Sequence, residues 1–122
     1  MTFADIRDMV MFQTGNDISD YAEFEPSLSE YINEGYGVIQ RDLFRKQVGI
    51  DFNRMVAADD VPDIPEALHR SIADYATYMV YRNGNVARQN RGVPFYQYFQ
   101  QAISDYKAFS IPGKTFINMF NQ

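Results

Sequence analysis

Histidine occurs only once in this chain of 122 residues, at position 69, and cysteine is absent. The lack of cysteine excludes thiolate catalysis, disulfide bonds and cysteine-type zinc sites. A catalytic or metal-binding histidine needs a partner base, a nucleophile or a second ligand. No such partner is apparent for His69, which falls in the first turns of a predicted helix, on its polar side. We therefore expect a solvated His69 and predict neither an enzyme nor a cofactor.

Acidic and amide side chains are concentrated between residues 16 and 25, and oxygen ligands of this kind suit calcium. An EF-hand loop requires them at alternating positions, with a glycine at the sixth. Tyr21 and Ala22 occupy the middle of this run, so the spacing does not fit. We predict an acidic loop that leads into the next helix, and no metal site.

A second polar stretch, between residues 82 and 91, is rich in guanidinium and amide groups. Its arginines are Arg82, Arg88 and Arg91, and its amides are Asn83, Asn85, Gln89 and Asn90. Such groups can bind a phosphate, or they can hold helices and neighbouring subunits together through planar hydrogen bonds. The stretch has no glycine-rich phosphate loop, so we favour the structural role. We predict that the three arginines contact a partner or a second subunit.

The clearest predicted helix runs from Asp63 to Arg82 and includes His69. Asp63 can cap it, Pro65 falls in the first turn, and Gly84 follows its end. Apolar residues recur at spacings of three and four, at Leu68, Ile72, Tyr75, Ala76, Met79 and Val80. The polar residues expected mostly outside this stripe are His69, Arg70, Ser71, Asp74 and Thr77. We expect a central, mostly buried helix of about five turns.

Two helices are predicted before this central one. Thr2 and Asp5 resemble a capping arrangement for a first helix that ends at Gly15. Ser27 is the predicted N-cap of a second helix, with Glu30 at capping-box spacing. Gly35 and Gly37 lie inside this second helix, where glycine is unfavourable, so we expect another backbone to cross closely there.

A fourth helix follows the central one. Asn85 can cap a short helical turn, after which Pro94 either kinks the chain or restarts the helix. A strong apolar stripe then continues to Phe109. Together these elements predict an all-α fold, a four-helix bundle with a long loop or short extended segment between helices 2 and 3 and an extended C-terminal tail.

Two segments of the chain lack a continuous helical pattern. Between residues 47 and 62, the alternation of Val48, Ile50 and Phe52 fits a short extended segment. A connection of this length is either a projecting loop that contacts a neighbour or a packed surface loop, and the sequence does not decide between them. The second segment, the tail, is broken by Pro112 and the glycine that follows it.

Apolar side chains in the tail either fold back on the core or dock into another protein, and we favour docking. The side chains concerned are Ile111, Phe116, Ile117, Met119 and Phe120.

Composition limits the classes of partner. Sixteen acidic and eleven basic residues give a net charge of −5, which disfavours general or sequence-specific binding of nucleic acid. Ten phenylalanines and nine tyrosines exceed what one small helical core can comfortably hide, so we expect some at an interface. The chain has no leader-like start and no long apolar run, and we expect a soluble, intracellular protein with no membrane contact.

Several runs of the sequence resemble a known family. They are D-I-R-D-M-V-M-F-Q-T-G-N-D, F-E-P-S-L-S-E-Y-I-N-E-G-Y, I-P-E-A-L-H-R-S-I-A-D-Y-A-T-Y-M-V-Y-R-N-G-N and Q-N-R-G. Across about residues 3 to 109 the chain is similar to the small helical head–tail connector, or adaptor, proteins encoded beside the portal gene in tailed bacteriophages. The resemblance implies a helical adaptor domain over 1–109 and a C-terminal docking tail over 110–122.

The same resemblance implies a dodecameric ring in the neck of the virion, assembled in the host cytoplasm. Such a ring sits beneath the portal protein, extends the DNA channel and receives the stopper or another tail-completion protein. The loop with Ile50 and Phe52, together with the tail, would contact neighbours and portal, and DNA would pass without sequence-specific binding. An acidic lumen would repel the phosphate backbone and let DNA slide. The alternative is a monomeric helical regulatory or inhibitor protein that binds a host protein or DNA.

Overall fold

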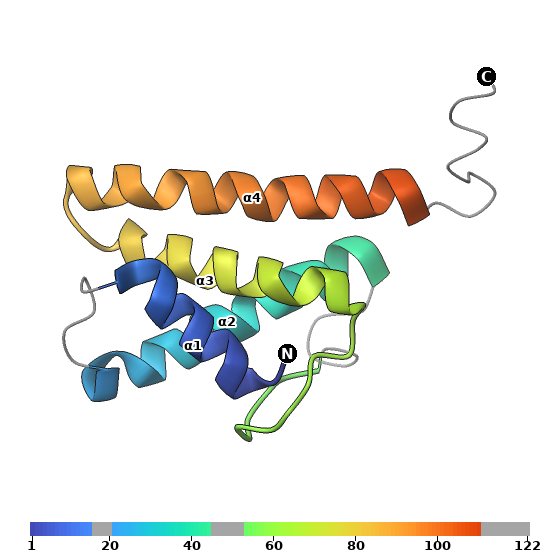
Figure 1. Ribbon diagram of the computed structural model, residues 1–122, viewed down its shortest axis with the longest axis horizontal. Helices are drawn as coiled ribbons and strands as arrows, with labels where there is room; N and C mark the ends of the chain where they lie inside the picture. The colour runs from blue at the N-terminus through green and yellow to red at the C-terminus, as the bar shows by residue number, and fades with distance from the viewer. Residues whose placement is uncertain (16–20, 45–52, 111–122) are drawn as a thin grey trace.

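The computed structural model describes residues 1–15, 21–44 and 53–110 of the chain (Figure 1). These ranges hold four α-helices, α1 (Phe3–Thr14), α2 (Tyr21–Phe44), α3 (His69–Arg82) and α4 (Val86–Ser110), and a 3-10 turn, η2 (Glu66–Leu68). Since no strand occurs within the same ranges, the predicted all-α fold with four helices is confirmed. None of these helices is long and apolar enough to cross a membrane.

The central helix is α3, which packs against each of the other three helices. In Figure 1, α4 runs along the upper side of α3, while α1 and α2 lie below it. This covering buries both the predicted apolar stripe and the side chains of Ser71, Asp74 and Thr77. The expected central, buried helix is confirmed, but the prediction that these polar residues fall mostly outside the buried stripe is wrong, because several helices surround α3.

The predicted start of this helix at Asp63 is also wrong. Ile64 precedes Pro65, and a residue before proline is disfavoured in the helical conformation. The backbone N–H of Asp63 donates a hydrogen bond to the Tyr36 hydroxyl, 2.7 Å away, which ties the chain to α2 at that point. Helical structure therefore begins with the 3-10 turn at Glu66 and continues as α3 from His69.

The predicted cap of α1 is confirmed as a complete capping box. The Thr2 N–H donates to the Asp5 carboxylate at 2.9 Å, and the Asp5 N–H donates to the Thr2 hydroxyl at 3.1 Å. Gly15 ends the helix with φ at +60°, a conformation that glycine adopts without strain. Between these ends, Ile6 and Val10 are fully buried.

The second helix, α2, begins at Tyr21, so the predicted N-cap at Ser27 is wrong. The Ser-x-x-Glu pattern is compatible with a helix interior, and here the Glu30 carboxylate pairs with Arg54 at 2.7 Å. α3 crosses α2 at Gly35 as expected, but a Cβ atom there would meet the side chain of Tyr75, with Cδ1 at 2.9 Å, and not another backbone. Glycine at this position therefore lets α3 approach α2.

The fourth helix, α4, begins at Val86 and continues through Pro94. The predicted restart of the helix at Pro94 is therefore not observed. The predicted cap is confirmed, because Asn85 Oδ1 accepts a hydrogen bond from the Arg88 N–H at 3.0 Å. Phe99 on α4 is buried and its ring lies 5.0 Å from that of Tyr75. Packing on α3 therefore holds α4 in place.

Polar side chains also join α1 to α3. Gln13 Nε2 donates to Asp74 Oδ1 at 2.9 Å, and the Thr77 hydroxyl donates to Gln13 Oε1 at 2.7 Å. Burial raises the pKa of the Asp74 carboxyl, and the bond from Gln13 and the charge of Arg70 offset only part of this effect. Ionisation of Asp74 in the folded protein therefore costs stability.

Replacing Asp74 with asparagine should remove this penalty while keeping an acceptor for Gln13. Because the folded-state pKa is raised, the penalty applies where the unfolded carboxyl is ionised, and it disappears below the unfolded-state pKa of about 3.9. We expect Asp74→Asn to raise the Tm by a few degrees at pH 7 and to change it little near pH 3. Thermal unfolding followed by circular dichroism checks this, with exposed Asp8→Asn as control. A lower Tm at pH 7 would contradict the expectation.

Candidate functional site

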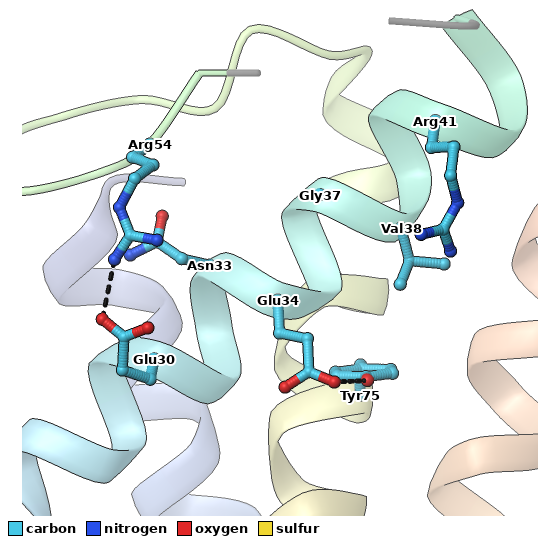
Figure 2. A pocket seen from close by; sticks show the side chains of 8 residues that line it. All are labelled: Glu30, Asn33, Glu34, Gly37, Val38, Arg41, Arg54 and Tyr75. Carbon is cyan, nitrogen blue, oxygen red and sulfur yellow. Dashed lines mark hydrogen bonds and ion pairs between the residues drawn. The ribbon is translucent and has the colours of Figure 1, made fainter. Parts of the chain in front are cut away.

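A groove of about 510 Å³ lies beside α2. Figure 2 shows Glu30, Glu34 and Arg41 along α2, Arg54 on the following loop above Glu30, and Tyr75 on α3 beside Glu34. Two interactions shape it, the Arg54–Glu30 ion pair and a 2.7 Å hydrogen bond that the Tyr75 hydroxyl donates to Glu34. The groove therefore carries charges of both signs.

The polar groups of this groove are largely paired with one another. Burial, and secondarily the Glu34 carboxylate, raises the pKa of Tyr75 far above its usual range, so its hydroxyl stays a proton donor. The Arg54–Glu30 pair is largely exposed and contributes little to stability. Within the ranges that the structure describes, no three histidine, aspartate or glutamate side chains converge to hold a metal ion.

Two buried amide side chains next to the groove fix the loop that follows α2. Asn33 pairs with the backbone of Met55, accepting from its N–H at 2.8 Å and donating to its carbonyl at 3.0 Å. Gln40 pairs in the same way with Asn53, at 2.9 and 3.0 Å. The two amides are seven positions apart, which is about two helical turns, so they lie on the same face of α2. We call these four hydrogen bonds the amide clamp.

The loop after the clamp is also tied to the start of the chain. The Phe3 N–H donates to the Asp60 carbonyl at 2.7 Å, and the Ala4 N–H donates to the Ala58 carbonyl at 3.0 Å. Of the two alternatives for residues 47–62, the packed surface loop is therefore the observed one from residue 53 onward. The remainder of this segment, with the predicted extended stretch, lies outside the described residues.

The predicted solvated histidine is wrong, because His69 is only 4% exposed. Its Nε2 lies 2.9 Å from the Ile64 carbonyl, and its Nδ1 lies 2.9 Å from the N-terminal ammonium of Met1. Donation from Nε2 leaves Nδ1 as the acceptor for the ammonium group. His69 thus joins α3 to the start of the chain and to the loop at Ile64. The sequence analysis did not predict these contacts, because it placed His69 on the polar side of its helix.

Of the three predicted arginines, Arg82 ends α3, and Arg88 and Arg91 lie in the first two turns of α4. The Arg88 guanidinium lies 5.9 Å from the centre of the Tyr81 ring, and Arg82 and Arg91 are exposed. Neighbouring amides stabilise the turn between α3 and α4, since Gln89 donates to the carbonyls of Arg82 and Gly84 at 3.2 and 3.1 Å. The structural role is thus observed for the amides, and contact of the arginines with a partner stays a prediction.

The remaining predicted interface residues lie outside the described part of the chain. They are Ile50 and Phe52 in the loop, and Ile111, Phe116, Ile117, Met119 and Phe120 in the tail.

Large apolar side chains are exposed on two helices that the sequence analysis did not single out for contact. Phe12 on α1 is 82% exposed and Tyr98 on α4 is 57% exposed. Val86 and Val93 on α4 are exposed as well. The surplus of aromatic residues predicted some exposure of this kind, but composition does not indicate which rings remain uncovered.

Comparisons with protein families, with curated proteins and with solved structures find no match to this chain. The resemblance to phage connectors therefore stays a prediction from the sequence.

The amide clamp can be tested by replacing Gln40 with glutamate, which has nearly the same shape. An ionised carboxylate cannot donate to the Asn53 carbonyl, and its burial is unfavourable, so we expect a loss of about 2–4 kcal/mol in urea unfolding at pH 7. Amide exchange at Asn53 and Met55 should also become faster. The same change at exposed Gln97 on α4 should alter stability by less than about 0.5 kcal/mol. Equal losses in the free energy of unfolding for Gln40→Glu and Gln97→Glu would show that the amide clamp does not stabilise the loop.

Proposed function

We propose that this chain is a structural subunit of a phage head–tail connector, which forms a ring below the portal protein. The observation that carries the proposal is the pair of exposed apolar surfaces on α1 and α4, marked by Phe12 and Tyr98. Single exposed apolar residues are common on soluble proteins, but clusters of them mark surfaces that contact other molecules. The sequence resemblance supplies the identity of the assembly.

The arrangement of the two surfaces supports a ring. Closed rings of identical subunits use heterologous contacts, in which each copy offers two different faces. Here α1 and α4 both pack on α3, and Figure 1 places them below and above it. A subunit built in this way has separate surfaces for the copy before it and the copy after it.

Charge supports the proposed passage of DNA. With a net charge of −5, the chain does not favour retention of the phosphate backbone. We place the arginine-bearing turn between α3 and α4 at a protein contact and away from the lumen. The tail from residue 111 onward is proposed to dock on the portal, and the opposite end of the ring to receive the stopper or another tail-completion protein.

The proposal is tested by imaging the protein mixed with a candidate portal protein. We expect negative-stain images and native mass spectrometry to reveal a closed ring on the portal, of about twelve copies as the resemblance to phage connectors implies. A chain that ends at Ser110 should bind the portal at least tenfold more weakly, while its circular dichroism remains unchanged.

A different outcome would favour the alternative function. If the chain stays monomeric with the portal at every concentration and shifts a DNA fragment at moderate salt, a monomeric regulatory protein explains the data better. The salt dependence of that shift then distinguishes specific binding from electrostatic attraction.

A further inference from the structure

A shallow hollow of about 560 Å³ lies beside the outer face of α1. Asp5, Asp8, Met9 and Phe12 border it and, at spacings of three and four, fall on one face of the helix. The surface of the hollow is mostly apolar, and Arg70 of α3 completes its rim together with Met1. We call this surface the α1 hollow.

The outer face of α4 has a complementary character. Tyr98 projects into solvent beside Phe95, with the two rings edge to face at 5.9 Å. Arg91, seven residues before Tyr98 and therefore on the same side of the helix, is also exposed. We call this surface the α4 face, and its apolar residues are aromatic, as contact surfaces favour.

Charge is segregated between the two surfaces. Residues 75–104 contain three of the eleven basic residues, at the α3–α4 turn and on α4, and none of the sixteen acidic residues. The α1 hollow instead carries two exposed carboxylates, Asp5 and Asp8, against the single guanidinium of Arg70. The ammonium group of Met1 is already engaged by His69.

We infer that the α4 face of one copy packs into the α1 hollow of a second copy, with Tyr98 against Phe12 and Met9. The arginines near the start of α4 then lie toward Asp5 and Asp8, and this attraction favours the pairing over contacts between two α4 faces. The inference rests on the proposed ring and names the contact that builds it. Each pairing leaves one hollow and one α4 face free at the ends, so assembly continues until the ring closes.

The absence of cysteine permits a direct test by cross-linking. Phe12→Cys and Tyr98→Cys are made in separate chains and treated with a short bis-maleimide, singly and mixed. We expect the mixture to give a Phe12→Cys to Tyr98→Cys dimer in about tenfold higher yield than either variant with itself, because contact raises the effective concentration of the two thiols. A chain with both substitutions should give a ladder of multimers.

Val56→Cys is the matched control, because Val56 in the loop is 81% exposed and Phe12 is 82% exposed. Its mixture with Tyr98→Cys should give no more dimer than random collision. If Tyr98→Cys perturbs folding, as judged by circular dichroism, Gln101→Cys replaces it, because Gln101 is exposed one turn further along the same side of α4. Equal yields with Phe12→Cys and Val56→Cys would overturn the inference.

The outcomes separate this contact from the proposed function. Indiscriminate cross-linking in a protein that still forms a ring on the portal would exclude the α1–α4 contact and leave the connector proposal standing. Selective cross-linking without any binding to the portal would support the contact and argue against the connector.

Discussion

Burial of α3 is the constraint on which the rest of this structure depends. A helix of 14 residues that is covered by three others must satisfy its polar side chains internally. Asp74 and Thr77 therefore bond to Gln13 of α1, and His69 bonds to the Ile64 carbonyl and the chain start. These bonds also set where α1 lies. The same covering leaves the outer faces of α1 and α4 in contact with solvent.

Much of the fold could be predicted because local signals and periodicity agree in the outer helices. The capping box of Thr2 and Asp5, the left-handed Gly15 and the cap at Asn85 each depend on neighbouring residues only. The start of α3 could not be placed as well, because a tertiary bond to Tyr36 competes with the apparent cap at Asp63. The burial of His69 likewise depends on Met1, which is distant in the sequence.

The candidate site was less predictable than the fold. The arginine stretch is a local feature and lies where the sequence placed it, at one helix turn. By contrast, the amide clamp pairs Asn33 and Gln40 with backbone groups of Met55 and Asn53. Every residue has such backbone groups, so the residue types at 53 and 55 do not identify them as the partners. Exposure of Phe12 follows from how α1 sits on α3. Together these features describe a domain whose loop is held by hydrogen bonds and whose exposed apolar residues include Phe12 on α1 and Tyr98 on α4.

The central claim is that copies of this chain meet through two different helical faces. Amide hydrogen exchange of the free chain and of the chain mixed with the proposed portal partner tests it most directly, because both faces are read in one experiment. The account predicts that residues 5–12 of α1 and 91–98 of α4 gain protection together, while the clamped loop around Met55 changes little. Increased protection confined to the loop, or no change in either helix, would contradict the account.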